Sequence, residues 1–219
     1  MARGKCGGAL GERVAVVGWP GMTRRLILGS GSARRKDLLE QAGFAFEVAS
    51  PDVEELAPGS LPLRKLCETN AMKKARAVVE DYPEAVVVAA DTLVSVDGEA
   101  LGKPEDLADA QGMLERLSGR VHEVCTGVCV RTAEEESTFF EVTWVKFQEL
   151  SAEVIASYLE KVEVLDKAGS YAIQDRGEML VEKIEGGFDN VVGLPVARVA
   201  AELERFGLRP VPGSLENMA

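Results

Sequence analysis

The chain has 219 residues, of which 46% are hydrophobic and 28% charged, and its formal net charge is −11 at pH 7. That length suits one compact unit or two lobes on a shared core, and no apolar run approaches the ~20 residues that span a membrane. The acidic balance argues against a nucleic-acid-binding surface, because phosphate backbones are held by basic faces.

The first stretch of the chain, residues 1–23, is rich in glycine and has no sustained hydrophobic period. We expect it to be a poorly ordered leader, followed by a single α/β domain over 24–209 and a tail over 210–219. A signal peptide is not indicated, because Glu12 and Arg13 interrupt any apolar core.

A strand, a glycine-serine turn and a basic helix start follow the leader. Leu26 to Leu28 suit a buried strand, and Ser32 suits the N-cap of the next helix. Free backbone N–H groups, the positive helix end and the side chains of Arg34 and Arg35 would converge there, which predicts an anion site. The same pattern also fits a capped surface helix with solvated arginines, and short glycine motifs do not decide between the two.

A second strand is expected at 44–48, and an acidic loop that contains Glu55 comes after it. Pro62 then opens a helix with a stripe of apolar or small residues, in which Asn70 also falls. Lys74 lies beside this stripe, so a solvated helix face is the simplest interpretation of that residue.

The strongest strand signal is at 85–90, where every residue is apolar, so we expect a central strand covered on both faces. The strand is expected to end at Asp91, and open α/β sheets bind ligands at such strand ends. A hairpin over 93–101 then returns Lys103 to the same end. Asp91 and Lys103 are therefore expected to face one another, either in a site or in a salt bridge that clamps the hairpin.

The second half of the chain predicts a helix, two antiparallel strands, a further helix, a long loop, a strand and a last helix. Their expected ranges are 106–117, 121–131, 139–147, 151–159, 164–177, 179–184 and 195–206. Long ordered loops such as 164–177 are more often functional than not.

The four cysteines, at positions 6, 67, 125 and 129, have no C-x-x-C spacing, and His122 is the only histidine. Zinc and a disulfide framework are therefore not predicted, and reduced, buried thiols of a cytosolic protein fit better.

Eight blocks in order connect these elements: S-G-S-A-R-R-K-D-L-L, E-E, K-K-A-R-A, A-D-T, G-K-P, L-S-G-R-x-H, D-K-A-G-S-Y-A-I-Q and N-V-V-G-L-P. In this order they resemble the Maf family of nucleotide pyrophosphatases, from about Leu26 to Phe206. The resemblance implies an α/β fold with an elongated mixed β-sheet flanked by helices and two lobes with a central cleft, similar to the inosine triphosphatase fold. It also implies cleavage of nucleoside triphosphates between the α and β phosphates, with a divalent cation, Mg²⁺ or Mn²⁺.

The resemblance assigns roles to eight residues. Asp91 matches the general base and, with Glu55, the metal position; the other substrate-binding positions are Ser30, Arg34, Lys74, Thr92, Lys103 and Gln174. Among the neighbouring basic residues the match singles out Arg34, so Arg35 and Lys36 are expected to contribute less. Two departures stand out: Ala33 replaces the usual Pro, and Asp175-Arg176 replaces a small continuation that often contains Gly, which changes the rim near the base.

The D-K-A-G-x-Y-x-I-Q block is similar to that of family members that hydrolyse dTTP and UTP rather than 7-methylated guanosine triphosphate. The Gln174 carboxamide and the Thr92 hydroxyl each donate and accept, which suits the O–NH–O edge of uracil or thymine, with CTP as the open competitor. We therefore expect a cytoplasmic house-cleaning enzyme with a nucleotide partner and no nucleic-acid or membrane partner; a homodimer is left open. The alternative is a nucleotide-sensing regulator of cell division with little catalysis, against which the presence of both Asp91 and Lys103 argues.

Overall fold

The computed structural model describes residues 24–211, and within them the strands form one mixed, seven-stranded sheet. The predicted leader and the last eight residues of the tail lie outside the described part. The strand order is β2-β1-β3-β5-β6-β7, with β4 paired to β3; β1 is parallel to β2 and β3, and the other pairs are antiparallel. The strands are β1 (Leu26–Leu28), β2 (Glu47–Val48), β3 (Val86–Val96), β4 (Glu99–Leu101), β5 (Val121–Arg131), β6 (Glu136–Phe147) and β7 (Val181–Glu185).

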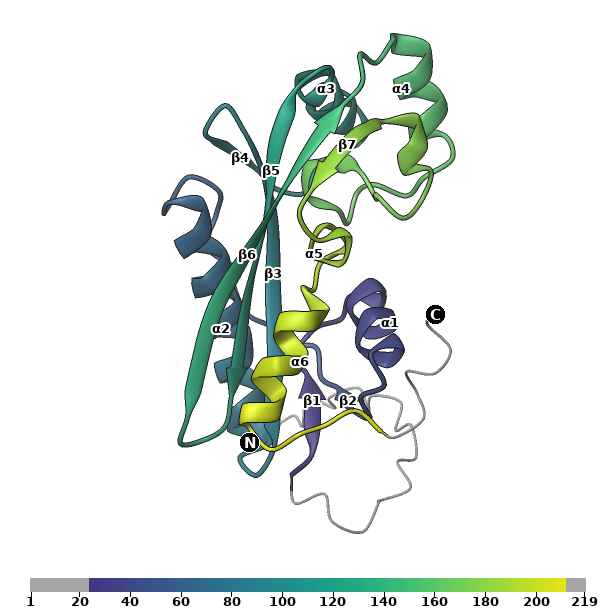
Figure 1. Ribbon diagram of the computed structural model, residues 1–219. Coiled ribbons are helices and arrows are strands. Elements are labelled where there is room, and N and C mark those ends of the chain that lie inside the picture. Colours follow the sequence, from purple (N-terminus) through teal and green to yellow (C-terminus); the bar gives the residue numbers. More distant parts are fainter. Residues whose placement is uncertain (1–23, 212–219) are drawn as a thin grey trace, which may run out of the picture.

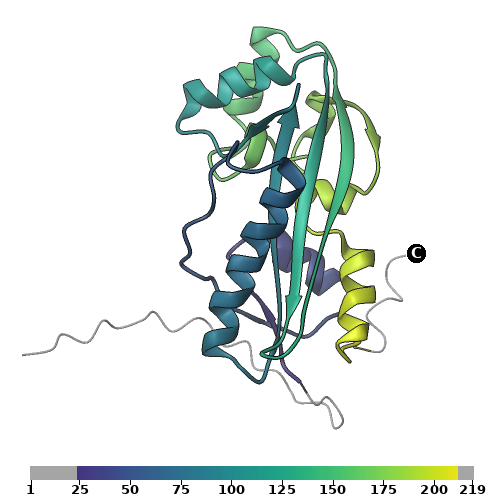
Figure 2. The ribbon, with the colours of Figure 1, turned by 90° about the vertical axis from the view of Figure 1, so that its left-hand side faces the viewer.

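Helices cover both faces of this sheet (Figure 1). The long α2 lies along one face, while α1, α5 and α6 lie on the other, and α3, α4 and β7 gather at the far end of the long strands (Figures 1 and 2). The helices are α1 (Ala33–Gln41), α2 (Leu63–Asp81), α3 (Leu107–Leu117), α4 (Ala152–Leu159), α5 (Phe188–Val192) and α6 (Val196–Arg205), with short 3₁₀ turns η1 (Ala168–Ser170) and η2 (Gly177–Met179). The predicted α/β class with helix-flanked mixed sheet is confirmed.

The three long strands β3, β5 and β6 run through two lobes (Figure 1). In the first lobe, Leu39 and Leu203 pack on one face of the sheet, and Val78 packs on the other. In the second lobe, Leu114 and Tyr158 pack over the far halves of the same strands. The apolar run at the start of β3 is buried on both faces because helices of the first lobe cover both sides.

One expectation about the central strand was wrong: β3 does not end at Asp91 but continues to Val96. The reason is that β5 pairs with β3 over its whole length, so the ladder continues past the polar residues. At the other edge of β3 the partner strand changes: the pairing with β1 stops at Val88, and the pairing with β4 starts at Val94. Within the described residues, this edge of β3 is therefore open over 89–93.

The bounds of other elements differ from the expected ones by a few residues. The second strand is shorter than expected, Glu47–Val48, and the strand expected at 179–184 is Val181–Glu185, preceded by a 3₁₀ turn. The helix α5 was not predicted, because five residues are too few to show a helical period.

Helix α2 approaches the sheet closely at Gly127 in β5. A Cβ atom on Gly127 would lie 2.3 Å from the backbone carbonyl carbon of Cys67. Glycine thus permits a backbone-to-backbone contact that carries the next turns of α2, with Asn70 and Lys74, over β3.

The thiols of Cys67, Cys125 and Cys129 are buried and free, as expected, while Cys6 lies outside the described residues. Within the described residues, no helix has both the length and the apolarity to cross a membrane.

Candidate active site

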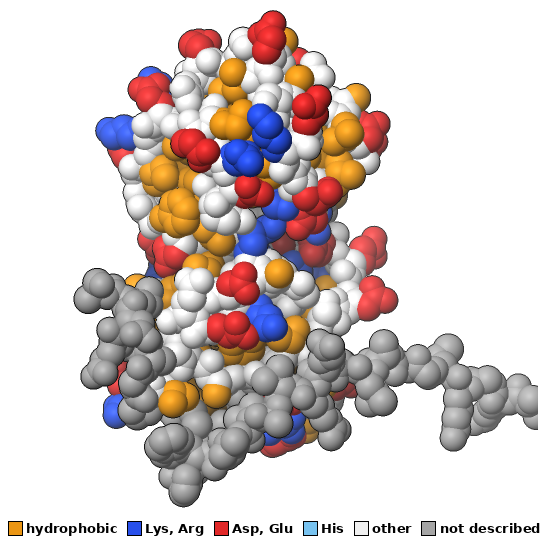
Figure 3. Space-filling model, turned by 90° about the vertical axis from the view of Figure 1, so that its right-hand side faces the viewer, with side chains coloured by type: hydrophobic (Ala, Val, Ile, Leu, Met, Phe, Trp, Pro, Cys, Tyr) orange, Lys and Arg blue, Asp and Glu red, His pale blue; other side chains and the backbone are white. Residues whose placement is uncertain are grey.

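A cavity of about 580 Å³ lies between the lobes, where the edge of β3 is open. Figure 3 shows Lys and Arg side chains gathered at the waist of the molecule, between the two lobes. The cavity brings together all eight residues to which the resemblance assigns a role: Ser30, Arg34, Glu55, Lys74, Asp91, Thr92, Lys103 and Gln174. Their roles remain predictions, but they share one site.

The carboxylate of Asp91 is 5% exposed and is held by two side chains of α2. Its Oδ1 accepts from Lys74 Nζ at 2.7 Å, and its Oδ2 accepts from Asn70 Nδ2 at 3.0 Å. These partners compensate for the burial of a charge. Lys74 is therefore not on a solvated helix face, and the alternative interpretation of Asp91 and Lys103 as a salt bridge that clamps the hairpin is not met within the described residues. Asn70 had no predicted role, although an amide in an apolar stripe was a usable signal.

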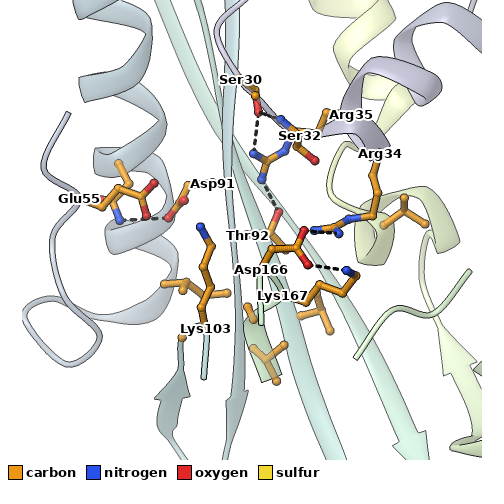
Figure 4. Close-up of a pocket in the computed structure, with 18 of the residues that line it drawn as sticks. Ser30, Ser32, Arg34, Arg35, Glu55, Asp91, Thr92, Lys103, Asp166 and Lys167 are labelled. Atoms are coloured by element: carbon orange, nitrogen blue, oxygen red, sulfur yellow. Dashed lines mark hydrogen bonds and ion pairs between the residues drawn. The ribbon is translucent and has the colours of Figure 1, made fainter. Parts of the chain in front are cut away.

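Lys74 also binds Glu55, so one ammonium joins two carboxylates (Figure 4). The distance from Lys74 Nζ to Glu55 Oε1 is 2.8 Å. Burial by itself would raise the pKa of Glu55, but the hydrogen bond and charge of Lys74, aided by Lys103 and Arg35, bring that pKa below its ordinary value. Lys103 is exposed and points into the cavity toward Asp91 and Thr92, with no ion pair to another described residue (Figure 4).

Two carboxylates in the cavity suit a divalent cation that is also bound by phosphate oxygens of a ligand. Within residues 24–211, no group of three or more acidic, histidine or cysteine side chains is placed to hold a metal ion. Glu55 and Asp91 are two carboxylates that face one cation, Lys74, across less than 3 Å each. Because Mg²⁺ in phosphate-binding sites takes one or two carboxylates and completes its shell with phosphate oxygens and water, this pair fits such an ion.

A second charged group links α1 to the long loop. Arg34 Nη1 lies 3.2 Å from Asp166 Oδ2, and Lys167 Nζ lies 2.5 Å from Asp166 Oδ1 (Figure 4). All three residues line the cavity, and they place two cations on the side of the site opposite Glu55 and Asp91 (Figure 4). Lys167 had no predicted role, although it belongs to the D-K-A-G-S-Y-A-I-Q block.

Arg35 was expected to contribute less than Arg34 to the site, but it makes three hydrogen bonds there. Its Nε donates to the carbonyl of Gly193 at 2.8 Å, its Nη1 to Ser30 Oγ at 3.2 Å and its Nη2 to Thr92 Oγ1 at 3.0 Å. Burial lowers the pKa of the Arg35 guanidinium, which the charge of Asp91 opposes, and arginine stays protonated in proteins. Arg35 is therefore engaged with the protein itself and fixes the two hydroxyl groups that it touches.

Ser30 is left as a hydrogen-bond donor by its neighbours. Its Oγ accepts from the backbone N–H of Ser32 at 3.2 Å and from Arg35 Nη1 at 3.2 Å. A hydroxyl oxygen has two lone pairs and one hydrogen, so the hydrogen of Ser30 remains for a ligand. This polarity suits a phosphate oxygen.

Asp91 and Thr92 are neighbours in β3 and point to opposite faces of the sheet. Asp91 contacts α2, whereas Thr92 contacts Arg35 of α1 and Thr126 of β5. Both side chains line the same cavity, because no strand of the described chain pairs with this edge of β3 between β1 and β4. A ligand in this site can thus reach both faces of one strand (Figure 4).

Comparison with known proteins adds the following findings. The family model described as "Maf-like protein" matches residues 25–206. A "dTTP/UTP pyrophosphatase" of Symbiobacterium thermophilum is 50% identical over 84% of this chain and 95% of its own length. Proteins of that name from Akkermansia muciniphila and Bacillus velezensis are 46% and 45% identical, over 84% and 86% of this chain and 97% and 100% of their own. The solved structure of the Staphylococcus aureus Ham1 protein is similar over 84% of this chain and 100% of that one, with 15% identity and a TM-score of 0.49.

Proposed function

The chain belongs to the Maf family, and we propose that it hydrolyses dTTP and UTP to the nucleoside monophosphate and pyrophosphate. The observation that carries this proposal is the cavity, in which a buried carboxylate, Asp91, stands among the cations Lys74, Lys103 and Arg34. The full-length similarity to proteins named dTTP/UTP pyrophosphatase supports the substrate class. Such an enzyme would act in the cytoplasm and remove unwanted pyrimidine triphosphates from the nucleotide pool.

Asp91 is the group suited to activate water. Its two oxygens are oriented by Lys74 and Asn70, and a carboxylate so held can take a proton from a water that attacks phosphorus. The proton would pass to Asp91 as the new P–O bond forms and the bond to the pyrophosphate oxygen breaks. The only histidine, His122, is fully buried and is not among the residues that line the cavity, so we assign the role of base to a carboxylate, and to Asp91 in particular.

The cations of the site match the charge of a triphosphate. Lys74, Lys103 and Arg34 would balance the negative charge that grows on the leaving pyrophosphate, and the free hydrogen of Ser30 would bind a phosphate oxygen. A divalent cation held by Glu55 and Asp91 would supply further charge neutralisation when bound. The nucleoside part would then lie on the Thr92 side of β3, near the exposed carboxamide of Gln174.

A pyrophosphate-release screen tests the proposal. The purified protein would be offered the canonical triphosphates and 7-methylated guanosine triphosphate with Mg²⁺ or Mn²⁺, and the products would be separated. We expect dTTP and UTP to be the best substrates, giving monophosphate and pyrophosphate rather than diphosphate and phosphate. A protein fastest on purines would contradict the substrate class. A protein that binds UTP but does not hydrolyse it with either metal ion would contradict the proposed enzymatic activity and favour a nucleotide sensor.

A further inference from the structure

We propose that Thr92 selects the nucleobase with a hydroxyl that can only accept a hydrogen bond, and that Thr126 and Arg35 are the positioning residues that hold it so. The inference rests on the proposed function, because it states how the cavity distinguishes uracil and thymine from cytosine. It also corrects the expectation that the Thr92 hydroxyl both donates to and accepts from the base. Thr92 is half-buried and lines the cavity.

The direction of the hydrogen bonds follows from counting protons. Thr126 Oγ1 lies 2.9 Å from the backbone carbonyl oxygen of Asn190, which can only accept, so the single hydrogen of Thr126 is used there. Thr126 Oγ1 also lies 2.9 Å from Thr92 Oγ1. Since Thr126 has no second hydrogen, Thr92 must be the donor in that contact.

Arg35 fixes the other side of the Thr92 oxygen. Arg35 Nη2 can only donate, and it lies 3.0 Å from Thr92 Oγ1, so it occupies one of the two lone pairs. The hydrogen of Thr92 is used by Thr126 and one lone pair by Arg35. What remains for a ligand is one lone pair, which can only accept.

This polarity is built into the buried part of the protein. Thr126 and Asn190 are both 0% exposed, and Arg35 is anchored independently by the carbonyl of Gly193 at 2.8 Å. To turn the Thr92 hydrogen toward the cavity, the protein would have to leave the Thr126 oxygen without its donor in a buried place, and an unsatisfied buried polar group is costly. The acceptor state is therefore the state that a nucleotide meets.

The bases that match an acceptor are those with an imide N–H. Uracil and thymine carry a hydrogen on N3, whereas cytosine presents a bare nitrogen with a lone pair at the same place. The acceptor lone pair of Thr92 can bind the N3–H of uracil and thymine, but it repels the N3 lone pair of cytosine. A site built for one hydrogen-bond pattern discriminates strongly against such a mismatch. The methyl group at C5 of thymine is not on this edge, so both uracil and thymine suit the site.

The test measures the binding of the α,β-imido analogues of UTP and CTP by calorimetry, beside kcat/KM for UTP and CTP. We expect the wild-type protein to favour the uridine compound by about tenfold or more. In Thr126→Val the hydrogen of Thr92 is released and can turn to cytosine N3, so the preference should fall to within about threefold, chiefly through tighter cytidine binding.

Thr143→Val is the matched control. Thr143 is also a fully buried threonine near α5, where it donates to the carbonyl of Gly187 at 3.0 Å and accepts from Asn190 Nδ2 at 3.0 Å. Within the described residues it makes no hydrogen bond to Thr92, so its loss should leave the ratio between uridine and cytidine as in the wild type. An equal change of the ratio in both variants would overturn the proposal, because it would trace to general loosening of α5.

A probe that needs no variant covers the case in which Thr126→Val does not fold. Methylation of the uridine analogue at N3 removes the donor, and we expect it to weaken binding by about tenfold or more, whereas methylation at C5 should not. Equal binding of the N3-methyl and parent compounds, or a wild-type preference for cytidine, would overturn the assignment of Thr92. Selective binding of uridine without hydrolysis would instead uphold this inference and contradict the proposed enzyme.

Discussion

At the scale of single side chains, the feature that matters most is how the carboxylate of Asp91 is held and oriented inside the protein. A buried carboxylate without partners would be costly, and here Lys74 and Asn70, both from α2, satisfy its two oxygens. Lys74 in turn contacts Glu55, which ties the acidic loop to the site. Asp91, Lys74 and Glu55 thus form one connected unit.

Replacing Asp91 by Asn should abolish most of the turnover. The amide keeps the shape of the side chain but cannot take a proton, and loss of general-base help typically lowers the rate by ~10²–10⁴-fold. We expect the melting temperature and the affinity for the imido analogue of UTP to change little. Steady-state pyrophosphate release, beside calorimetric binding, would show whether the rate alone is lost.

Asp97→Asn is a suitable control for that variant. Asp97 lies in the turn after β3, is exposed and pairs with Arg120 at the surface. Its φ of 53° is one that Asn tolerates, so this change should leave the rate near that of the wild type. Near-wild-type turnover of Asp91→Asn would mean that another group is the base.

The motif blocks were enough to predict eight residues that share the cavity, but not the hydrogen-bond partners of these residues. Motif blocks pointed to Asp91 and Lys74, yet they said nothing of the contact between them, because it depends on how α2 packs on β3. For the same reason Arg35 was expected to be minor, although the structure gives it three acceptors. The polarity of Thr92 depends on Thr126, which is 34 positions away.

At the scale of elements, the position of α2 depends on one glycine in β5. The Cβ of an alanine at Gly127 would overlap the backbone of Cys67, which cannot give way as a flexible side chain would. Helix α2 carries Asn70 and Lys74, so the separation between α2 and β5 also sets the geometry around Asp91.

Gly127→Ala should therefore destabilise the protein and reduce activity together. Overpacking of this kind typically costs ~1–3 kcal/mol, and denaturant unfolding would measure it. Gly112→Ala is the matched control, because Gly112 lies inside α3 with open space around it, and there alanine should stabilise by ~0.5–1 kcal/mol. A Gly127→Ala protein as stable and active as the wild type would show that α2 can shift without consequence.

A buried histidine ties the long loop to the sheet. His122 of β5 is fully buried, its Nε2 lies 2.9 Å from the hydroxyl of Tyr171, and its ring packs edge-on against Phe147 and Tyr171. Burial lowers the pKa of His122 from 6.5 to about 4. Because Tyr171 lines the cavity, the protonation of His122 bears on the site as well as on stability.

His122 should make stability depend on pH. As the pH falls below 6.5 the unfolded chain binds a proton on His122, whereas the folded protein binds it only near pH 4, so stability is full above pH 6.5 and is lost toward pH 4. The loss from this one group between about pH 7 and about pH 5 should be about 2 kcal/mol. Urea unfolding of the wild type and of His122→Gln at both pH values would check it, since the variant should lose about 2 kcal/mol less than the wild type. Equal losses would contradict this role.

Element types were largely predictable because the hydrophobic periods are clear, but the extent of β3 was not. The local sequence pattern predicted that the strand ends at Asp91, since a charged residue interrupts the apolar run there. In the folded protein the strand continues because β5 pairs with it as far as Ser95, and Lys74 compensates the charge. A ladder partner and a counter-ion, both distant in sequence, override the local pattern.

At the scale of the whole molecule, the lobes share their strands. β3, β5 and β6 each have 11 or 12 residues and contribute to the cores of both lobes. Neither lobe can lose its sheet without disrupting the other. The site therefore lies on a framework common to both halves, and not at a hinge between two independent domains.

We expect the two lobes to unfold in a single transition. Hydrogen exchange followed by mass spectrometry in increasing urea should give the same midpoint for peptides from α2 in the first lobe and from α3 and α4 in the second, since the strands that both lobes share couple their unfolding. Distinct midpoints for the two sets, separated by a populated intermediate, would contradict this expectation.

The open edge of β3 also bears on self-association. An unpaired strand edge is a template on which a strand from another molecule can add, and such additions lead to aggregation. Here the opening covers only residues 89–93, and β1 and β4 block its two ends. An incoming strand longer than this opening would collide with one of them. Asp91, Thr92 and Leu93 of this stretch line the cavity, so the strand edge meets the ligand site at a place where other chains cannot extend the sheet.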